Sequence, residues 1–200
     1  MWVLVTLLFL APTSLRVGAA MPAAARLNWT FQPFPQPTVM GDIARLVTPE
    51  ASFLLLFETG TTWTSQDGRE WAMHSPSNGE SSIAEGIGHA MASLGSMALI
   101  FGGRGTQTGQ PTRGTFLFNM QDGWRMDITP DQDPSPRYFH AMASLGQGRT
   151  GGDQLVMFGG FDVATNEALG DTYVYTVGEG WSEMITALSP PSRAYHAMAG

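Results

Sequence analysis

The chain has 200 residues, which is enough for one domain of ordinary size. Its 17 acidic residues outnumber 10 basic ones, all arginine, so the formal net charge is −7. Because the chain is acidic and lacks a basic cluster, we expect it to bind neither nucleic acid nor anionic membrane surfaces. A hydrophobic fraction of 43% argues against disorder, and 24 glycines with 13 prolines favour short strands joined by many turns.

The first segment of the chain, residues 1–20, resembles a secretory signal peptide. An apolar run from Trp2 to Ala11 is followed by small residues at 17–20 of the kind that signal peptidase favours. The run is shorter than the roughly 20 residues that span a bilayer as a helix, so we expect no membrane insertion by this segment. The alternatives are an uncleaved anchor or a wrongly assigned start site.

The next signal is Asn28-Trp29-Thr30, an acceptor triplet for N-glycosylation at Asn28. It agrees with a chain that enters the secretory pathway, and we expect the protein to be secreted or extracellular. The chain has no cysteine. A secreted chain without disulfides must be stabilised by core burial alone, which a closed β architecture can provide.

From residue 86 onward the chain repeats itself with a period near fifty residues. Each copy contains a histidine, a Gly-Gly doublet, an aromatic strand and a tryptophan. The landmarks are His89, Gly102, Gly103 and Trp124 in one copy, His140, Gly159, Gly160, Tyr173 and Trp181 in the next, and His196 at the start of another. The doublet and the tryptophan are 21 residues apart in both copies. One supersecondary unit is therefore repeated.

Each copy predicts four short antiparallel strands. In the copy that begins at 138 we expect them at 138–145, 154–159, 171–177 and 181–187. We expect the glycine doublets to let the backbone turn and a neighbouring aromatic ring approach closely. The tryptophans should be buried between strands, where each contributes roughly 2–3 kcal/mol.

The combined landmarks resemble the kelch repeat of β-propellers, which has a histidine-rich first strand, a Gly-Gly doublet, an aromatic third strand and a tryptophan opening the fourth. The resemblance covers residues 86–200. It implies an all-β fold made of kelch-type blades of four antiparallel strands. On this interpretation, residues 86–133 and 138–188 are two kelch blades, and residues 193–200 begin a further blade.

Weaker versions of the same pattern precede residue 86. Residues 43–76 are interpreted as a degenerate blade, because Leu54–Phe57 matches a second strand and Trp71 matches Trp124 two residues late. Within the N-terminal segment 21–42, residues 27–32 resemble a fourth strand without its first three. In propellers such an orphan outer strand usually completes the last blade and closes the ring.

The count of blades predicts an incomplete propeller. Two full blades, one degenerate blade and two fragments cannot close a ring that normally needs at least four. We therefore expect a fragment, a truncated gene model or part of a longer protein. If the chain ends at residue 200, its open edge strands would favour self-association.

Chemistry-bearing motifs have structural interpretations here. The three repeated histidines occupy equivalent places in successive blades, which a ring would separate, so we expect no metal site. Ser65–Trp71 resembles the Asp-box of sialidase propellers, which is itself a structural turn. Galactose oxidase also has kelch-like blades, but its copper chemistry requires a cysteine that this chain lacks. We expect no catalytic residues and no cofactor in this segment.

The resemblance also implies a binding face. In kelch propellers the loops before the first strand and between the second and third strands usually contact the partner. The candidate binding residues on those loops are Arg104, Arg113, Arg137, Asp162 and Arg193. Arg137 and Arg193 occupy equivalent places and would present guanidinium groups to an acidic partner. The alternative is that each arginine only ties down its own loop.

The resemblance implies a secreted binding module, with a protein as its ligand and without catalysis in this segment. This step is an analogy, because propellers support many unrelated activities. The alternative is the N-terminal part of an extracellular propeller enzyme, galactose-oxidase-like or glycan-active, with its catalytic residues beyond residue 200. A third interpretation is the product of a faulty gene model.

Overall fold

The computed structural model describes residues 42–58, 60–74, 86–105, 108–112, 114–127, 133–149 and 151–200. All described residues belong to one compact unit, residues 37–200. The expected signal peptide at 1–20, the strand at 27–32, Asn28 and Arg113 lie outside the described residues. Within those residues, no helix has the length and apolar character needed to span a membrane.

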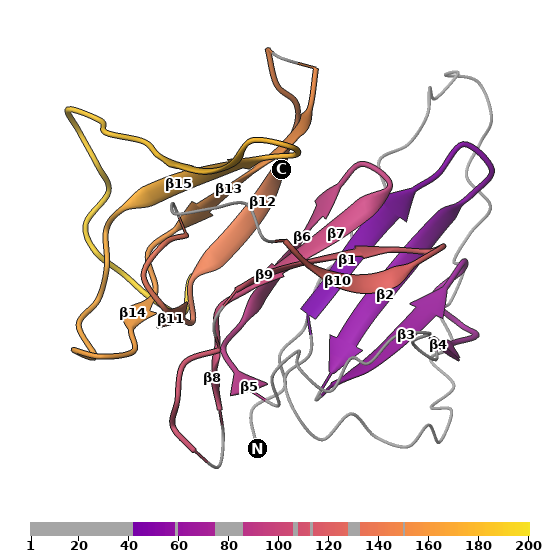
Figure 1. The fold of residues 1–200 in the computed structure, drawn as a ribbon, viewed down its shortest axis with the longest axis horizontal. Coiled ribbons are helices and arrows are strands. Elements are labelled where there is room, and N and C mark those ends of the chain that lie inside the picture. Colours follow the sequence, from indigo (N-terminus) through magenta and orange to yellow (C-terminus); the bar gives the residue numbers. More distant parts are fainter. Residues whose placement is uncertain are drawn as a thin grey trace, which may run out of the picture. The chain divides into compact units, whose positions relative to one another are not determined.

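The described residues form an all-β structure, as expected, with three antiparallel sheets of four strands (Figure 1). The first sheet has the order β1 (Asp42–Val47), β2 (Ser52–Glu58), β3 (Thr61–Ser65) and β4 (Ala72–His74). The second has β6 (Ala90–Leu94), β7 (Met97–Phe101), β9 (Thr115–Asn119) and β10 (Gly123–Asp127). The third has β12 (Ala141–Gln147), β13 (Asp153–Phe158), β15 (Thr172–Thr176) and β16 (Gly180–Glu183). We call each sheet, with the loops that precede it and join its strands, the first, second or third repeat.

Two short ribbons accompany the second and third sheets and were not predicted from the sequence. One pairs β5 (Gly86–Ile87) with β8 (Arg104–Gly105), and the other pairs β11 (Arg137–Tyr138) with β14 (Phe161–Asp162). Each ribbon joins the loop before the first strand of its sheet to the loop after the second strand. The ribbons thereby fix the position of both loops.

The strand boundaries of the third sheet differ from the expected ones by three or more residues in two places, and by one or two residues elsewhere. The strand expected at 138–145 begins only at Ala141, because Phe139 has a left-handed backbone with φ of 55° that interrupts a strand. The strand expected at 181–187 ends at Glu183. In contrast, the weakly patterned segment at 43–76 coincides with a four-stranded sheet that begins at Asp42, and its last strand β4 starts directly after Trp71.

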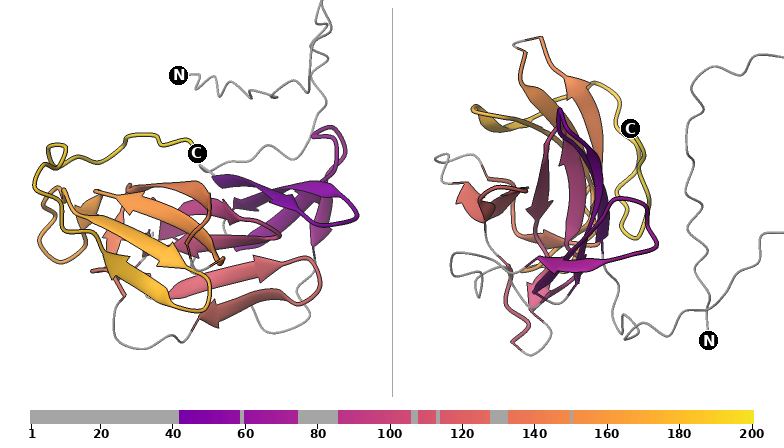
Figure 2. Two further views of the ribbon diagram at one scale, coloured as in Figure 1. Left: turned by 90° about the horizontal axis from the view of Figure 1, so that it is seen from above. Right: turned by 90° about the vertical axis from the view of Figure 1, so that its right-hand side faces the viewer.

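Strands β6, β7 and β9 of the second sheet are buried on both faces, because their residues alternate between two hydrophobic cores. In β7, Ala98 and Ile100 belong to a core shared with Leu55 and Phe57 of the first sheet. Leu99 and Phe101 belong to a core shared with the third sheet. The period of two residues is that of a strand whose side chains point to opposite faces. The first strands are neighbours as well, since β6 packs against both β1 and β12 (Figure 2).

A repeated contact joins each sheet to the next. Phe57, near the end of β2, lies between His89 and Trp124 of the second repeat, with ring centroids 5.4 Å away in both cases. The indole Nε1 of Trp124 donates a hydrogen bond of 2.8 Å to Oγ1 of Thr62, which pairs with Phe57 across β2 and β3.

The second and third repeats make the same contact. Phe101 lies 5.8 Å from the ring of His140 and 5.3 Å from that of Trp181. Trp181 Nε1 donates a hydrogen bond of 2.8 Å to Oγ1 of Thr115, the cross-strand partner of Phe101. Trp124 and Trp181 are 5% and 3% exposed, so the expected burial of both tryptophans is confirmed.

The glycine doublets allow the backbone of the next repeat to approach. Gly102 has a φ of +71°, and a Cβ there would collide with the carbonyl oxygen of Arg137. The following N–H, of Gly103, donates a hydrogen bond of 2.8 Å to that same oxygen. Gly159 and Gly160 stand in the same relation to the carbonyl of Arg193. The close neighbour is thus a backbone carbonyl in addition to the expected aromatic ring.

Candidate binding surface at the loop end of the sheets

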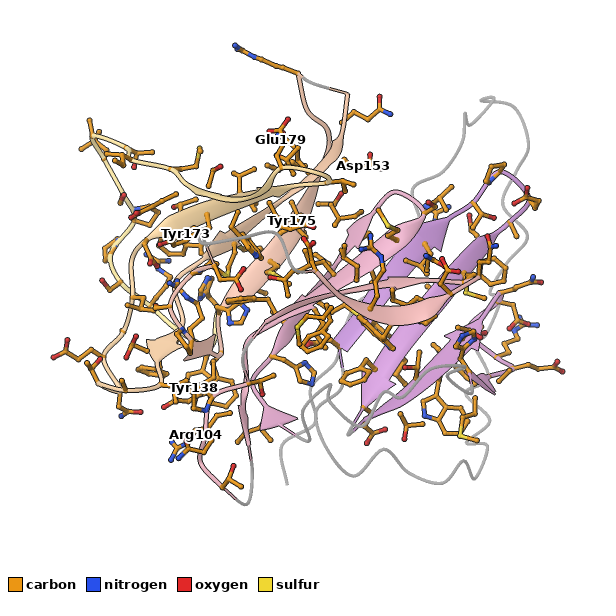
Figure 3. All side chains as sticks on the ribbon, viewed as in Figure 1. Arg104, Tyr138, Asp153, Tyr173, Tyr175 and Glu179 are labelled. Carbon is orange, nitrogen blue, oxygen red and sulfur yellow. The ribbon has the colours of Figure 1, made fainter. Side chains whose placement is uncertain are left out.

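The ribbons gather the loops of successive repeats at one end of the sheets. We call this end the loop face and define it by residues 86–88, 104–105, 137–139, 161–162 and 193–195. Figure 3 shows Arg104 and Tyr138 at this end, whereas Asp153 and Glu179, next to hairpin turns, lie at the opposite end. Most of the residues that the sequence identified as binding candidates belong to the loop face.

A left-handed residue recurs on the loop face just before each repeated histidine. Gly88, Phe139 and Tyr195 have φ values of 76°, 55° and 56°. The N–H of Phe139 donates to the carbonyl of Gly88 at 2.7 Å, and the N–H of Tyr195 donates to the carbonyl of Phe139 at 3.0 Å. A bulky residue in this conformation costs of order 1–3 kcal/mol. The second repeat avoids that cost with glycine, so the later aromatic residues suggest a role beyond folding.

Phe139 and Tyr195 form a cluster with side chains of the β11–β14 ribbon, which belongs to the third repeat. The rings of Phe139 and Tyr195 stack with centroids 4.1 Å apart, and Phe161 lies 5.8 Å from Tyr195 and 5.6 Å from Tyr138. The guanidinium carbon of Arg104 lies 5.8 Å from the centroid of the Tyr138 ring, within cation–π distance. Tyr195 is 68% exposed, whereas Tyr138 is buried. The cluster therefore combines a rigid base with an exposed ring.

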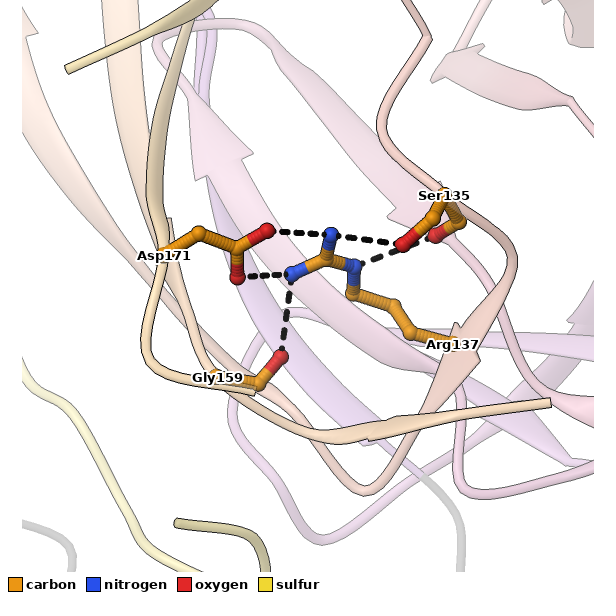
Figure 4. A network of polar contacts seen from close by, with 4 residues as sticks. All are labelled: Ser135, Arg137, Gly159 and Asp171. Atoms are coloured by element: carbon orange, nitrogen blue, oxygen red, sulfur yellow. Dashed lines mark hydrogen bonds and ion pairs between the residues drawn. The ribbon is translucent and has the colours of Figure 1, made fainter. Parts of the chain in front are cut away.

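Arg137 is held inside the protein, as Figure 4 shows. Its side chain is fully buried, and its two terminal nitrogens donate to the carboxylate of Asp171 at 2.6 and 2.8 Å. It also donates to the carbonyl of Gly159 at 3.2 Å, and to the carbonyl and hydroxyl of Ser135 at 3.1 and 3.0 Å. The expectation that Arg137 presents its guanidinium to a partner is therefore wrong. The structure supports the alternative that this arginine ties down its loop.

The other candidates divide into structural and exposed residues. Asp162 accepts backbone hydrogen bonds of 2.9 Å from Thr165 and Ala164, and these bonds lower the pKa of its carboxyl. It therefore caps its own loop. Arg193 is exposed and donates from Nε to the carbonyl of Pro191 at 3.0 Å. Arg104 is exposed too. Arg104 and Arg193 are the candidate arginines that the loop face offers to a partner.

The repeated histidines pack on phenylalanines of the preceding repeat. His140 is buried, and burial lowers the pKa of its imidazole to about 3. Neither of its ring nitrogens has a well-aligned hydrogen-bond partner among the described residues. A contact with the backbone of Phe101 raises the pKa of His140, but by less than burial lowers it. His89 contacts the Asp42 carboxylate through Nδ1 at 2.6 Å. In the described part of the chain, no three His, Cys, Asp or Glu residues are grouped to hold a metal ion.

The segment Ser65–Trp71, which resembles an Asp-box, forms a turn held by one carboxylate. Oδ1 of Asp67 accepts hydrogen bonds from the N–H groups of Arg69 and Glu70 at 2.8 and 3.1 Å. These bonds lower the pKa of Asp67. The turn borders a pocket of about 490 Å³ that also includes Phe53 and Trp71. Asp67 is occupied by the turn itself, as the structural interpretation of this motif expects.

Several residues of the surface were missed by the sequence reasoning. These are Ser135, Phe139, Phe161, Asp171 and Tyr195. A comparison of the repeats contained a usable signal, because the residue before each repeated histidine is Gly88, Phe139 or Tyr195. No equivalent signal in the sequence placed Asp171 beside Arg137, since 34 residues separate them.

No protein-family model matches the chain, and no curated protein matches it.

Proposed function

We propose that the chain is part of a kelch-type β-propeller that is secreted and binds a protein ligand through its loop face. The contact residues in this proposal are the exposed Tyr195, its stacking partner Phe139, and the arginines Arg104 and Arg193. The partner contributes acidic side chains for the guanidinium groups and an apolar surface for the tyrosine ring.

The repeated contacts between sheets support the propeller. Each of the first two sheets accepts a histidine and a tryptophan from the next repeat against one phenylalanine, and a threonine hydroxyl accepts the indole N–H. A contact that recurs in the same form applies a similar rotation from one sheet to the next. Repetition of that rotation around an axis beside the first strands is the geometry of a propeller.

The cluster of aromatic rings and arginine on the loop face is the observation that carries the binding proposal. Arg104 is exposed over the Tyr138 ring, and Tyr195 is stacked on Phe139 and attached to a left-handed backbone. A preorganised aromatic ring loses little conformational entropy when a partner covers it. Tyrosine and arginine are also enriched among the residues that dominate binding energy in protein interfaces.

A displayed peptide library tests the proposed surface without knowledge of the natural ligand. We expect immobilised wild-type chain to enrich peptides that combine Asp or Glu with apolar residues. The Tyr195→Ala and Arg104→Ala variants should bind the enriched peptides at least tenfold more weakly. Ile185→Ala is the matched control, because Ile185 is 94% exposed and lies outside the loop face. Equal binding by wild type and Tyr195→Ala would contradict the proposal.

Expression in a secretory host tests the compartment. We expect the chain to appear in the medium without residues 1–20 and with a glycan at Asn28. The Asn28→Gln variant should be secreted with a lower mass, equal to that of the wild type after enzymatic removal of N-glycans. Retention of an unprocessed, unglycosylated chain inside the cell would contradict secretion.

A further inference from the structure

The second and third repeats differ at two equivalent positions of the loop end. Asp171 precedes Thr172, which pairs with Phe158, and Gly114 precedes Thr115, which pairs with Phe101. Asp171 and Gly114 are therefore equivalent in register. By the same comparison, Arg137 opens strand β11 and Gly86 opens strand β5 of the corresponding ribbons. The third repeat has an internal ion pair at these two positions, and the second repeat has a glycine at each of them.

A pocket of about 410 Å³ lies beside one of these glycines. Gly114, Phe101 and Met126 line it, and Asp133 and Thr112 contribute polar groups. A Cβ at Gly114 would meet no atom closer than 3.6 Å, and its nearest neighbours would be Met126 and Phe116. The second repeat thus keeps open space at the position where the third repeat carries the Asp171 carboxylate.

The polar groups of the pocket are suited to a cation. Oδ1 of Asp133 accepts a hydrogen bond of 3.3 Å from the hydroxyl of Thr115. That hydroxyl oxygen accepts the indole N–H of Trp181, so the proton of Thr115 is directed to Asp133. The hydroxyl oxygen of Thr112 is buried without a hydrogen-bond partner among the described residues. The pocket therefore offers a carboxylate and a vacant hydroxyl next to apolar walls.

The third repeat shows which cation this environment fits. There the Arg137 guanidinium lies 5.3 Å from the centroid of the Tyr173 ring and donates to the carbonyl of Gly159. In the second repeat, Phe116 is in register with Tyr173 and Gly102 with Gly159. Phe116 and Gly102 do not line the pocket, but the pocket has a carboxylate as well, with Asp133 in place of Asp171. An arginine side chain also has the apolar stem that Phe101 and Met126 can cover.

We propose that this pocket binds the guanidinium group of an arginine side chain supplied by a partner protein. The second repeat takes from outside the group that the third repeat supplies from its own chain. Charge complementarity to Asp133 selects a cation, and the Thr112 hydroxyl can accept a hydrogen bond from the guanidinium. None of the residues that line the pocket is among those that define the loop face, so this proposal does not rest on the proposed function.

Titration with N-acetyl-L-arginine methylamide tests the proposal, with the methyl carbon signal of Met126 in methionine-labelled protein as the readout. We expect a saturable shift of this signal. Asp133→Asn should weaken binding at least tenfold, while Glu179→Gln removes an exposed carboxyl at the opposite end and should leave binding unchanged. The indole N–H signal of Trp181 shows that each variant is folded. The corresponding lysine derivative should bind at least threefold more weakly.

Three outcomes would overturn the proposal: the absence of a saturable shift, equal binding by Asp133→Asn, or equal binding of the lysine derivative.

The Arg113→Ala variant addresses the chain's own arginine, because Arg113 lies between lining residues 112 and 114 but outside the described residues. Binding seen only in this variant would mean that Arg113 occupies the pocket, which excludes a partner's arginine. Tyr195→Ala should leave the titration unchanged, so failure of the loop face and failure of the pocket are distinguishable.

Discussion

The second and third repeats reach the same sheet architecture with opposite chemistry at the loop end. The third repeat buries the Arg137–Asp171 ion pair, whereas the second has Gly86 and Gly114 at the equivalent positions. Both nevertheless contain the same four-stranded sheet and the same position of the tryptophan. The difference teaches that the landmarks between sheets specify the architecture, while the residues at the loop end are free to vary.

The comparison also indicates what the ion pair contributes. A buried ion pair is weak evidence for net stability, because the loss of hydration offsets much of the attraction between the charges. The second sheet forms without one. The guanidinium of Arg137 instead joins Ser135, Gly159 and Asp171, which belong to three separate segments. The pair therefore serves mainly to position the loop that leads into the third sheet.

The largest effect is expected from breaking the ion pair on one side. Asp171→Ala should lower the free energy of unfolding by about 3–5 kcal/mol, because it leaves a fully buried guanidinium without its counter-charge. Arg137→Ala should cost less, since the Asp171 side chain is 24% exposed and can rehydrate. The Arg137→Ala/Asp171→Ala double variant imitates the second repeat and should recover part of the Asp171→Ala loss. Urea denaturation measures all three, and simple additivity would contradict this view of the pair.

The next effect concerns pH and the buried His140. Burial lowers the pKa of His140 from 6.5 to about 3, so below pH 6.5 the unfolded chain binds a proton that the folded chain does not. The stability that comes from keeping His140 neutral is fully present above pH 6.5. It is lost as the pH falls toward 3, because protonation of this histidine then favours the unfolded chain. The loss amounts to about 2 kcal/mol between pH 7 and pH 5. Urea denaturation of His140→Phe should show a pH dependence smaller by that amount, and an unchanged dependence would contradict burial of a neutral imidazole.

A smaller effect separates the two tryptophan–threonine hydrogen bonds. Thr62→Val and Thr115→Val each remove the hydroxyl that accepts a hydrogen bond from the indole of a buried tryptophan, which should cost roughly 1–2 kcal/mol in thermal or urea unfolding. The two variants should differ in a second measurement. Thr115 also donates to Asp133, so only Thr115→Val should weaken the arginine titration of the pocket. Equal effects of both variants on that titration would mean that Asp133 does not take part in arginine binding.

The smallest effect is expected at the exposed Arg104. Its guanidinium lies over Tyr138 but remains in water, so Arg104→Ala should lower the free energy of unfolding by no more than about 1 kcal/mol. This variant sharpens the contrast with Arg137, the arginine that is fully buried. Urea denaturation gives the stability, and the peptide display described above gives the binding. A loss as large as that of Arg137→Ala would contradict the assignment of Arg104 to an exposed surface.

The repeated landmarks allowed most of the fold to be predicted. Trp124 and Trp181 were expected in buried positions and are buried, because a large apolar side chain at a repeated position has few other uses. The first strand of the third sheet was predicted three residues too early. Its error comes from Phe139, whose left-handed conformation depends on hydrogen bonds to Gly88 and Tyr195 in the neighbouring repeats.

The binding candidates were less predictable than the fold. Arg104 and Arg137 were both binding candidates, yet Arg104 is exposed and Arg137 is buried. The burial of Arg137 depends on a carboxylate within reach of its guanidinium, and Asp171 is 34 residues from Arg137. Local sequence patterns contain no information about such a pairing, because they report periodicity within a strand and turn chemistry within a loop.

The sequence by itself determined the all-β class, the four-stranded repeats and the buried tryptophans that pack against the preceding sheet. These features follow from short-range periodicity and from landmarks at constant spacing. Only the tertiary structure decided which arginine is internal, which aromatic ring is exposed and where the pocket beside Asp133 lies. These features arise where segments from different repeats meet. Their energies depend on distance and burial, which the order of residues along the chain does not specify.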